Sequence, residues 1–160
     1  MRFTIDASVH LNALNPGEEG SAVSQRFLAR VHRPPPPEAV TSPHTVVSPT
    51  LLMVEIAAAV ARAFDDSERG ARLAWAVREL PAQECFALDA SLAEAAAEVA
   101  AGRRLRGADA VYAAVARRSG SRLVTLDRQQ LERLPPAIPT CRPKEALDLL
   151  DRASEGATAK

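Results

Sequence analysis

Asp6 and Asp127 each follow directly after a short apolar segment, where the ligand sites of many α/β proteins lie. Asp6 closes the segment Arg2–Ile5, and Asp127 closes Leu123–Leu126. Ligands of open parallel sheets bind beyond the carboxyl ends of the strands, so both carboxylates are candidates for one shared site. An aspartate in this position is also a common helix N-cap, and this purely structural interpretation is equally open for each of them.

Glu55 and Asp109 are the other two acids that need an explanation. Glu55 shares a helical stripe with Leu52, Ile56 and Val60, and glutamate is rarely buried unless its charge is compensated. Asp109 lies in the first turn of an expected helix, where the helix dipole favours an anion. Structural alternatives exist here too. Glu55 could lie at the edge of its stripe or pair with an arginine, and Asp109 could act as a cap.

Together the four acids indicate a metal site. Carboxylates that converge on one sheet edge repel one another at neutral pH. Mg²⁺ or Mn²⁺, which prefer oxygen ligands, would remove that repulsion and could activate water against a phosphodiester. The spacing of His10, His32 and His44 suits no metal, which agrees with a site made of carboxylates. We interpret these three histidines as surface or loop residues. Cys85 and Cys141 are expected to be ordinary reduced thiols.

The elements that must position these acids alternate between strands and helices, which predicts an α/β fold with a parallel sheet covered on both faces. A serine N-cap at Ser48 with Pro49 in the first turn, and a capping box from Ser91 to Glu94, are predicted to begin two of the helices. The predicted strands span about 2–5, 45–47, 85–88, 122–126 and 137–141, and the helices about 21–32, 49–64, 68–80, 92–101, 107–118, 128–134 and 144–152.

We expect residues 1–152 to form one domain and residues 153–160 to be a disordered tail. A proline-rich insertion at about 33–43 is expected to be a surface loop. A docking motif for an aromatic groove is the alternative interpretation of this insertion, but no flanking repeat supports it.

The overall charge neither requires nor excludes a nucleic-acid partner. The formal net charge is zero, from twenty basic and twenty acidic residues, and without the four candidate ligands only sixteen acids oppose the twenty bases. The remaining surface is therefore mildly basic, which is compatible with phosphate binding. The N-terminus lacks the apolar stretch of a signal peptide, and no apolar run approaches membrane-spanning length, so we expect a cytoplasmic protein.

Several of these segments resemble the characteristic blocks of PIN domains, and most closely those of the VapC-type toxins of prokaryotic VapBC toxin–antitoxin pairs. The resemblance spans 2–150 and rests on Asp6-Ala7-Ser8, on Glu55 within a helix, on 106–116 (RGADAVYAAVA) and on 123–127 (LVTLD). It implies a parallel five-stranded sheet with helices on both sides and a Mg²⁺- or Mn²⁺-dependent endoribonuclease. It also implies a homodimer, and a cognate antitoxin that inserts a segment into the active-site groove.

The same resemblance implies which residues act. Asp6, Glu55, Asp109 and Asp127 correspond to the family's acidic residues, with Asp6, Asp109 and Asp127 binding the metal and Glu55 binding it or orienting a metal-bound water. Ser8 and Thr125 match small hydroxyl positions beside the first and last acids, with a supporting role. The chain departs from the family at the long 33–43 insertion and at His10, where an aliphatic residue is usual.

Arginines and one tyrosine complete the expectations. Arg62, Arg103, Arg104 and Arg106 could hold an RNA backbone, but arginines near helix ends are as often solvated partners of carbonyl groups. We expect Tyr112 to be a core residue and not a platform for base stacking.

Other functions remain open from the sequence. A haloacid-type phosphatase would need a second aspartate where Ser8 stands. A receiver domain would need a lysine near the last strand, and Lys144 and Lys160 are not suitably placed. A housekeeping PIN ribonuclease would carry the same acids as a toxin. A catalytically silent PIN-like binding module is a further alternative, although the presence of all four acids argues against it.

Overall fold

The chain forms a five-stranded parallel sheet, as the sequence predicts. The computed structural model describes residues 1–35 and 44–158. Every pair of neighbouring strands is parallel, and the spatial order is β3-β2-β1-β4-β5. The strands are β1 (Arg2–Ile5), β2 (Thr45–Pro49), β3 (Gln83–Phe86), β4 (Arg122–Val124) and β5 (Thr140–Cys141).

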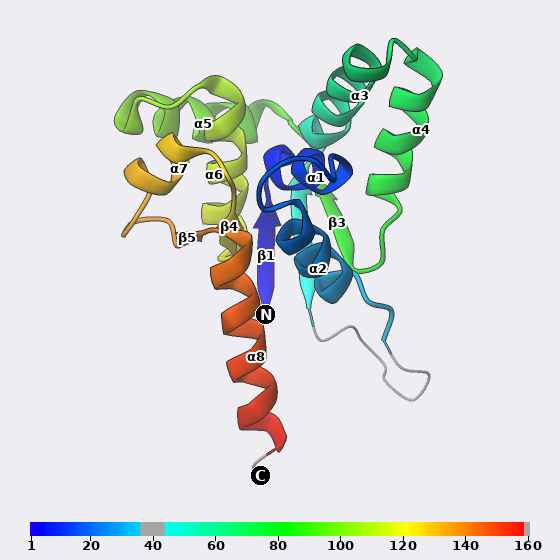
Figure 1. Cartoon of the computed structure of the whole chain (residues 1–160). Coiled ribbons are helices and arrows are strands. Elements are labelled where there is room, and N and C mark those ends of the chain that lie inside the picture. The colour runs from blue at the N-terminus through cyan, green and yellow to red at the C-terminus, as the bar shows by residue number, and fades with distance from the viewer. Residues whose placement is uncertain (36–43, 159–160) are drawn as a thin grey trace.

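Helices connect the strands and cover both faces of the sheet (Figure 1). In the described residues they are α1 (Ala7–Leu14), α2 (Ser21–Val31), α3 (Leu51–Phe64), α4 (Ser67–Arg78), α5 (Ala90–Arg103), α6 (Gly107–Ser119), α7 (Arg128–Arg133) and α8 (Pro143–Thr158). The predicted α/β architecture, a parallel sheet with helices on both faces, is therefore confirmed.

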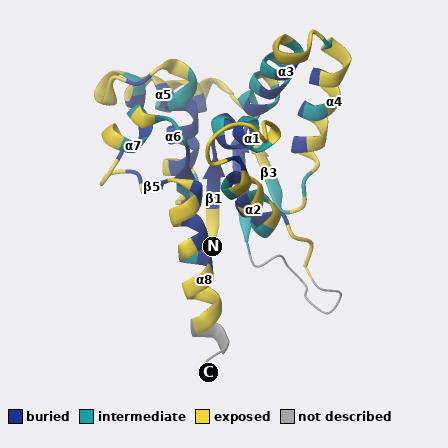
Figure 2. Ribbon diagram, viewed as in Figure 1, coloured by how far each residue is buried: buried dark blue, intermediate teal, exposed yellow. Residues whose placement is uncertain are grey.

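Side-chain alternation along the strands produces the two apolar layers. Phe3 and Ile5 of β1 are buried together with Phe27 of α2 and Leu150 of α8. On the opposite face, Leu123 of β4 joins the core formed with α3, α4 and α6. Figure 2 shows buried residues along the sheet and the inner helix faces, with exposed residues on the outer faces and at the far end of α8. The central strand is thereby fixed from both sides.

The two predicted helix starts are wrong. Pro49 ends β2, and the Ser48 hydroxyl donates to the Ile5 carbonyl oxygen at 3.4 Å and so is not available to cap a helix. At the next helix, the N-cap is Asp89, whose carboxylate accepts from the Leu92 N–H at 2.8 Å. Asp89 precedes the predicted Ser91–Glu94 capping box, so the helix begins earlier.

Other boundaries also differ from the predictions. The sequence analysis missed α1, although it recognised Asp6 as a possible cap. The third strand spans Gln83–Phe86, and the fifth contains only Thr140–Cys141, shorter than predicted. The last helix continues through Thr158, beyond the expected end of the domain at 152. Residues 36–43, most of the proline-rich insertion, lie outside the described residues.

His10 and His32 are buried, not on the surface or in loops as we predicted. Their exposed fractions are 3% and 6%, and their ring centroids are 6.4 Å apart. The amphipathic helices α1 and α2 pack face to face, which turns both imidazoles inward. The Nε2 atom of each ring has no hydrogen-bond partner, while Nδ1 of His32 bonds to the Pro81 carbonyl oxygen.

This burial makes stability sensitive to acid. Burial, and secondarily the nearby His32, lower the pKa of His10 from 6.5 to about 3. Stability is therefore complete above pH 6.5 and falls as pH drops from 6.5 towards 3, because only the unfolded chain takes up the proton. We expect the free energy of unfolding to decrease by up to about 2 kcal/mol at pH 5. Urea unfolding at pH 7 and 5 tests this, and a His10→Phe variant that kept the full loss would contradict it.

Helices α3 and α4 form a closely packed antiparallel pair. Gly70 of α4 faces the backbone of α3, where a Cβ atom would lie 2.5 Å from the Ala57 carbonyl oxygen. Since α3 carries Glu55, this close approach also determines where that carboxylate lies. In the part of the chain that the structure describes, no helix has both the length and the apolar character needed to cross a membrane.

Candidate functional site

The end of β1 places Asp6 at the carboxyl edge of the sheet. Asp6 is only 5% exposed and acts as the N-cap of α1, with Oδ1 accepting from the Ser8 N–H at 2.8 Å. Its own N–H donates to the Val124 carbonyl oxygen of β4 at 3.0 Å. The capping interpretation is therefore correct, but it uses only one carboxylate oxygen. The other oxygen, Oδ2, accepts a hydrogen bond from the Gln130 side chain at 2.9 Å.

Asp127 occupies the equivalent position after β4. It caps α7, with Oδ1 accepting from the Gln130 N–H at 2.9 Å, and its own N–H donates to Thr125 Oγ1 at 3.0 Å. Ser8 Oγ accepts from the Leu126 N–H at 3.1 Å, which ties the start of α1 to the loop after β4. The hydroxyls of Ser8 and Thr125 thus fix the backbone that carries the two aspartates.

One buried amide connects Asp6 to Asp109. Gln130 is fully buried, and its Nε2 donates to Asp6 Oδ2 at 2.9 Å and to Asp109 Oδ1 at 3.1 Å. Carboxylate oxygens only accept, so the nitrogen of this amide, not its oxygen, must face them. Asp6 and Asp109, which lie far apart in the sequence, therefore converge on one atom.

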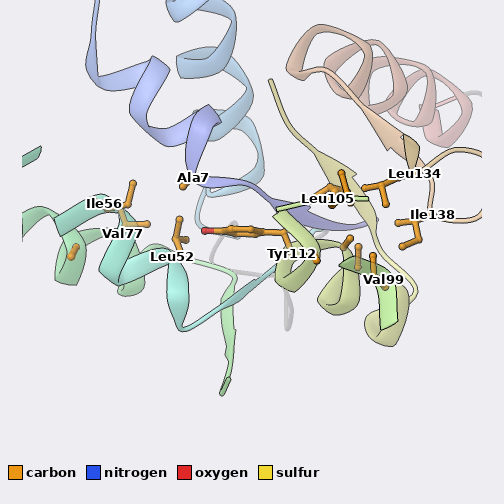
Figure 3. Packing of buried hydrophobic residues seen from close by; sticks show 14 of the residues in the cluster. Ala7, Leu52, Ile56, Val77, Val99, Leu105, Tyr112, Leu134 and Ile138 are labelled. Carbon is orange, nitrogen blue, oxygen red and sulfur yellow. The ribbon is translucent and has the colours of Figure 1, made fainter. Parts of the chain in front are cut away.

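Glu55 is held by Tyr112. The Tyr112 hydroxyl donates to Glu55 Oε2 at 2.6 Å, a short bond typical of a charged acceptor. Figure 3 shows the Tyr112 ring within the apolar cluster, with its oxygen directed towards Leu52 and Ala7. Tyr112 is thus a core residue, as predicted, whose polar end also positions a carboxylate.

The pKa values indicate that the four acids act on one another. Partial burial raises the pKa of Asp109, and the charges of Asp127 and Asp6 raise it further. Partial burial also raises the pKa of Glu55, with further increases from Asp6 and Asp109, although the Tyr112 hydrogen bond opposes them. The structure therefore brings all four predicted acids into one electrostatic cluster.

The donor set suits a hard divalent cation. Its atoms are carboxylate oxygens, and Asp109 Oδ2 is buried without a hydrogen-bond partner, which is costly unless something compensates it. Among the described residues, no group of three or more His, Cys, Asp or Glu side chains has a ready arrangement for a metal ion. The Gln130 amide stands between one oxygen of Asp6 and one oxygen of Asp109, and its two hydrogen bonds keep these oxygens apart.

The arginines predicted to bind RNA lie at different distances from this cluster. Arg106 immediately precedes α6 and is close enough to Asp109 for its charge to lower that residue's pKa. Arg62, Arg103 and Arg104 are exposed, and the Arg104 carbonyl oxygen accepts a hydrogen bond from the Arg133 guanidinium. Of the four, Arg106 is the arginine whose charge acts on the acidic cluster.

Sequence reasoning missed the roles of Gln130 and Tyr112. Gln130 follows the N-cap Asp127 by three positions, the spacing of a capping box, which was a usable signal. In the structure its side chain reaches across to Asp6 and Asp109. No local pattern marks the bond between Tyr112 and Glu55, because it joins α6 to α3 across the core.

Comparison with known proteins agrees with this architecture. The model of the PIN domain family matches residues 3–135, and no curated protein matches the chain. Three of the similar solved structures are VapC20 from Mycobacterium tuberculosis, described as a sarcin–ricin loop cleaving toxin, a toxin–antitoxin complex from Klebsiella pneumoniae, and PAE2754 from Pyrobaculum aerophilum.

These three structures share the fold at low sequence identity. The VapC20 match has 22% identity and a TM-score of 0.61, covering 79% of this chain and 90% of that one. The Klebsiella match has 14% identity and a TM-score of 0.57, covering 88% and 96%. The PAE2754 match has 21% identity and a TM-score of 0.61, covering 95% and 96%. With the family model matching most of its length, the chain belongs to the PIN domain family.

Proposed function

We propose that this protein is a Mg²⁺- or Mn²⁺-dependent endoribonuclease and the toxin of a VapBC-type toxin–antitoxin pair. The observation that carries the proposal is the convergence of Asp6 and Asp109 on one buried amide. Asp127 lies close enough to raise the pKa of Asp109, and Asp109 lies close enough to raise the pKa of Glu55. Clustered carboxylates are unfavourable without a cation, so a function that requires one accounts for their placement.

Asp6, Asp109 and Asp127 would hold the cation, and Glu55 would bind it or orient a water molecule at the site. A divalent ion supplies an activated water nucleophile and stabilises the charge that develops on the phosphate. The unpartnered Asp109 Oδ2 is the oxygen most in need of such a ligand. Ser8 and Thr125 keep the aspartate backbones in register, and Tyr112 restrains the Glu55 carboxylate.

RNA would be held by its phosphates. Arg106 stands beside Asp109 and is exposed, so its guanidinium can contact a phosphate next to the cation site. Contacts of this kind bind any sequence, and they weaken as salt concentration rises. Such an enzyme would act on RNA in the cytoplasm.

The proposal includes an antitoxin and a homodimer. One of the similar solved structures is a toxin–antitoxin complex, which supports a protein partner. This chain has an apolar hollow of about 490 Å³ between α1 and α3, with the exposed Leu14 and Phe64 on its lining. Exposed apolar surface of this kind is typical of interaction sites.

Cleavage of a panel of single-stranded and structured RNAs tests the activity. The purified protein, freed of any antitoxin, is assayed with Mn²⁺, Mg²⁺ or EDTA, beside Asp109→Asn and the surface variant Asp148→Asn. We expect cleavage that needs the cation, is lost in Asp109→Asn and persists in Asp148→Asn. Failure to cleave, together with failure to bind Mn²⁺, would rule out the nuclease and favour a silent binding module.

Growth of a bacterial host tests the toxin assignment separately. Induced expression of the wild-type chain is expected to arrest growth, whereas Asp109→Asn is not. Normal growth with full RNA cleavage in vitro would instead indicate a housekeeping ribonuclease.

Replacing Tyr112 by phenylalanine should reduce the cleavage rate about tenfold. The change removes only the hydroxyl that holds Glu55 Oε2 at 2.6 Å, and a hydrogen bond to a charged group is worth roughly 1.5–3 kcal/mol. The effect should fall on kcat, with KM for RNA unchanged. A Glu55→Gln variant provides the comparison, since Tyr112→Phe should add little to it. An unchanged kcat in Tyr112→Phe would contradict a positioning role.

A further inference from the structure

We propose that the Gln130 amide takes the place of the cation in the metal-free protein and is displaced when the cation binds. This inference rests on the proposed function, because it concerns the same carboxylates. It adds Gln130, which is not an acid. The carboxylates favour binding of the cation, whereas the Gln130 amide opposes it. In this assignment Gln130 is a positioning residue that competes with the ion.

The geometry of the amide supports this role. Its two N–H groups point to Asp6 Oδ2 at 2.9 Å and Asp109 Oδ1 at 3.1 Å, so the nitrogen stands between two negative charges. Amide hydrogens carry partial positive charge, which offsets part of the repulsion between the carboxylates. Gln130 is 0% exposed, and its hydrogen bond to Asp6 is buried, which strengthens the attraction between the amide and the carboxylate.

The spacing explains why a cation and the amide exclude each other. Mg²⁺ holds its oxygen ligands at about 2.1 Å, much shorter than the two hydrogen bonds to Nε2. Direct coordination of Asp6 Oδ2 and Asp109 Oδ1 by one ion would place that ion where the amide nitrogen now stands, so the amide would have to leave. This agrees with the lack of a ready three-ligand cluster in the described part of the chain.

Among the described residues, only these two hydrogen bonds hold the amide group of Gln130. Its Oε1 atom is buried without a hydrogen-bond partner, so turning the side chain away breaks only the two bonds to the carboxylates. The backbone of Gln130 remains fixed, because its N–H donates to Asp127 Oδ1 at 2.9 Å. The amide can therefore leave without unwinding the start of α7.

Mn²⁺ titration of three full-length proteins tests the exchange: the wild type, Gln130→Met and the matched control Gln129→Met. Methionine keeps the unbranched shape but removes the donor. Gln129 lies on the same helix, where its Oε1 accepts a hydrogen bond from Arg133 Nη1 at 3.3 Å. We expect metal-free Gln130→Met to melt at a lower temperature than the other two. Its Mn²⁺ affinity, measured by calorimetry, should be at least about tenfold higher, because the wild type must break two charged hydrogen bonds and even one is worth about that factor.

Two results would overturn the proposal. Equal metal-free melting of Gln130→Met and Gln129→Met would show that the amide does not stabilise the carboxylates. Weaker or unchanged Mn²⁺ binding by a folded Gln130→Met would show that the amide does not compete with the ion. If Gln130→Met fails to fold, Gln130→Leu, refolded with Mn²⁺, replaces it. Leucine also lacks the donor, adds no charge of its own, and should likewise bind Mn²⁺ more tightly than the wild type.

The failure of the proposed function gives a different pattern. In that case Mn²⁺ would bind neither the wild type nor any variant, or would bind wild type and Asp6→Asn equally. Either result removes the cation from the site and overturns the exchange with it. The comparison of metal-free melting temperatures would still decide whether Gln130 stabilises the two carboxylates.

Discussion

The Asp6→Asn variant should lose at least about a thousandfold in RNA cleavage rate while remaining folded. Asparagine has almost the same shape but removes a full negative charge from the centre of the proposed cation site. Loss of one group that stabilises the charge of the transition state typically costs a factor of a hundred to a thousand. Loss of the cation would cost more, because the activated water disappears as well.

The fold should survive because the capping interactions of Asp6 can be kept. Asparagine caps helices as well as aspartate, so its Oδ1 can still accept from the Ser8 N–H. Its new Nδ2 would lose the hydrogen bond from Gln130 Nε2, but removal of one of the clustered negative charges offsets that loss. We expect the free energy of unfolding to change by less than about 1 kcal/mol.

Asp66→Asn is the matched control for this experiment. Asp66 is also an N-cap aspartate, accepting from the Arg69 N–H at 2.8 Å, and it belongs to α4 and not to the acidic cluster. Cleavage rates and urea unfolding curves of both variants are compared with those of the wild type. Full activity in Asp6→Asn would exclude Asp6 from the site. Loss of activity in both variants would mean that the assay reports folding.

Gly70→Ala should lower the free energy of unfolding by about 2 kcal/mol, a large effect for a single methyl group. The added Cβ would lie 2.5 Å from the Ala57 carbonyl oxygen and 3.1 Å from the Ala61 Cβ, so α3 and α4 must separate. Inserting a methyl group into such a contact typically costs about 1–3 kcal/mol. Because Glu55 lies on α3 close to Ala57, the proposed nuclease activity should fall as well.

Gly102→Ala is expected to have the opposite sign. Gly102 lies within α5, and a Cβ added there would have nothing within 4 Å. Alanine is favoured over glycine inside a helix by about 1 kcal/mol, so this variant should be more stable than the wild type. Urea unfolding followed by circular dichroism measures both variants. Equal stability of Gly70→Ala and the wild type would show that α3 and α4 can separate without cost.

The carboxylate cluster was predictable because each acid carries a local signal. Asp6 and Asp127 end apolar strands, Asp109 lies in a first helical turn, and Glu55 interrupts an apolar stripe. Parallel strands place their carboxyl ends at one edge of the sheet, so these local signals together predict that the acids lie close to one another. The assignment of roles to the four acids remains a prediction.

The remaining features depend on contacts between distant segments. The Gln130 side chain finds its partners 124 and 21 residues away, and periodicity cannot anticipate such pairs. His10 and His32 were placed wrongly for the same reason, since the packing of α1 against α2 decides their burial. Ser48-Pro49 has the composition of a helix start, but pairing of β2 with β3 extends the strand through both residues.

The order of the strands along the chain determines when the acidic cluster can form during protein synthesis. Asp6 and β1 leave the ribosome more than a hundred residues before Asp127, Gln130 and the strand β4 that pairs with β1. A nascent chain therefore carries Asp6 and Glu55 well before Asp109 and Asp127 have been made. Under the proposed function, the chain cannot cleave the RNA being translated until β4 and Asp127 have emerged and joined β1.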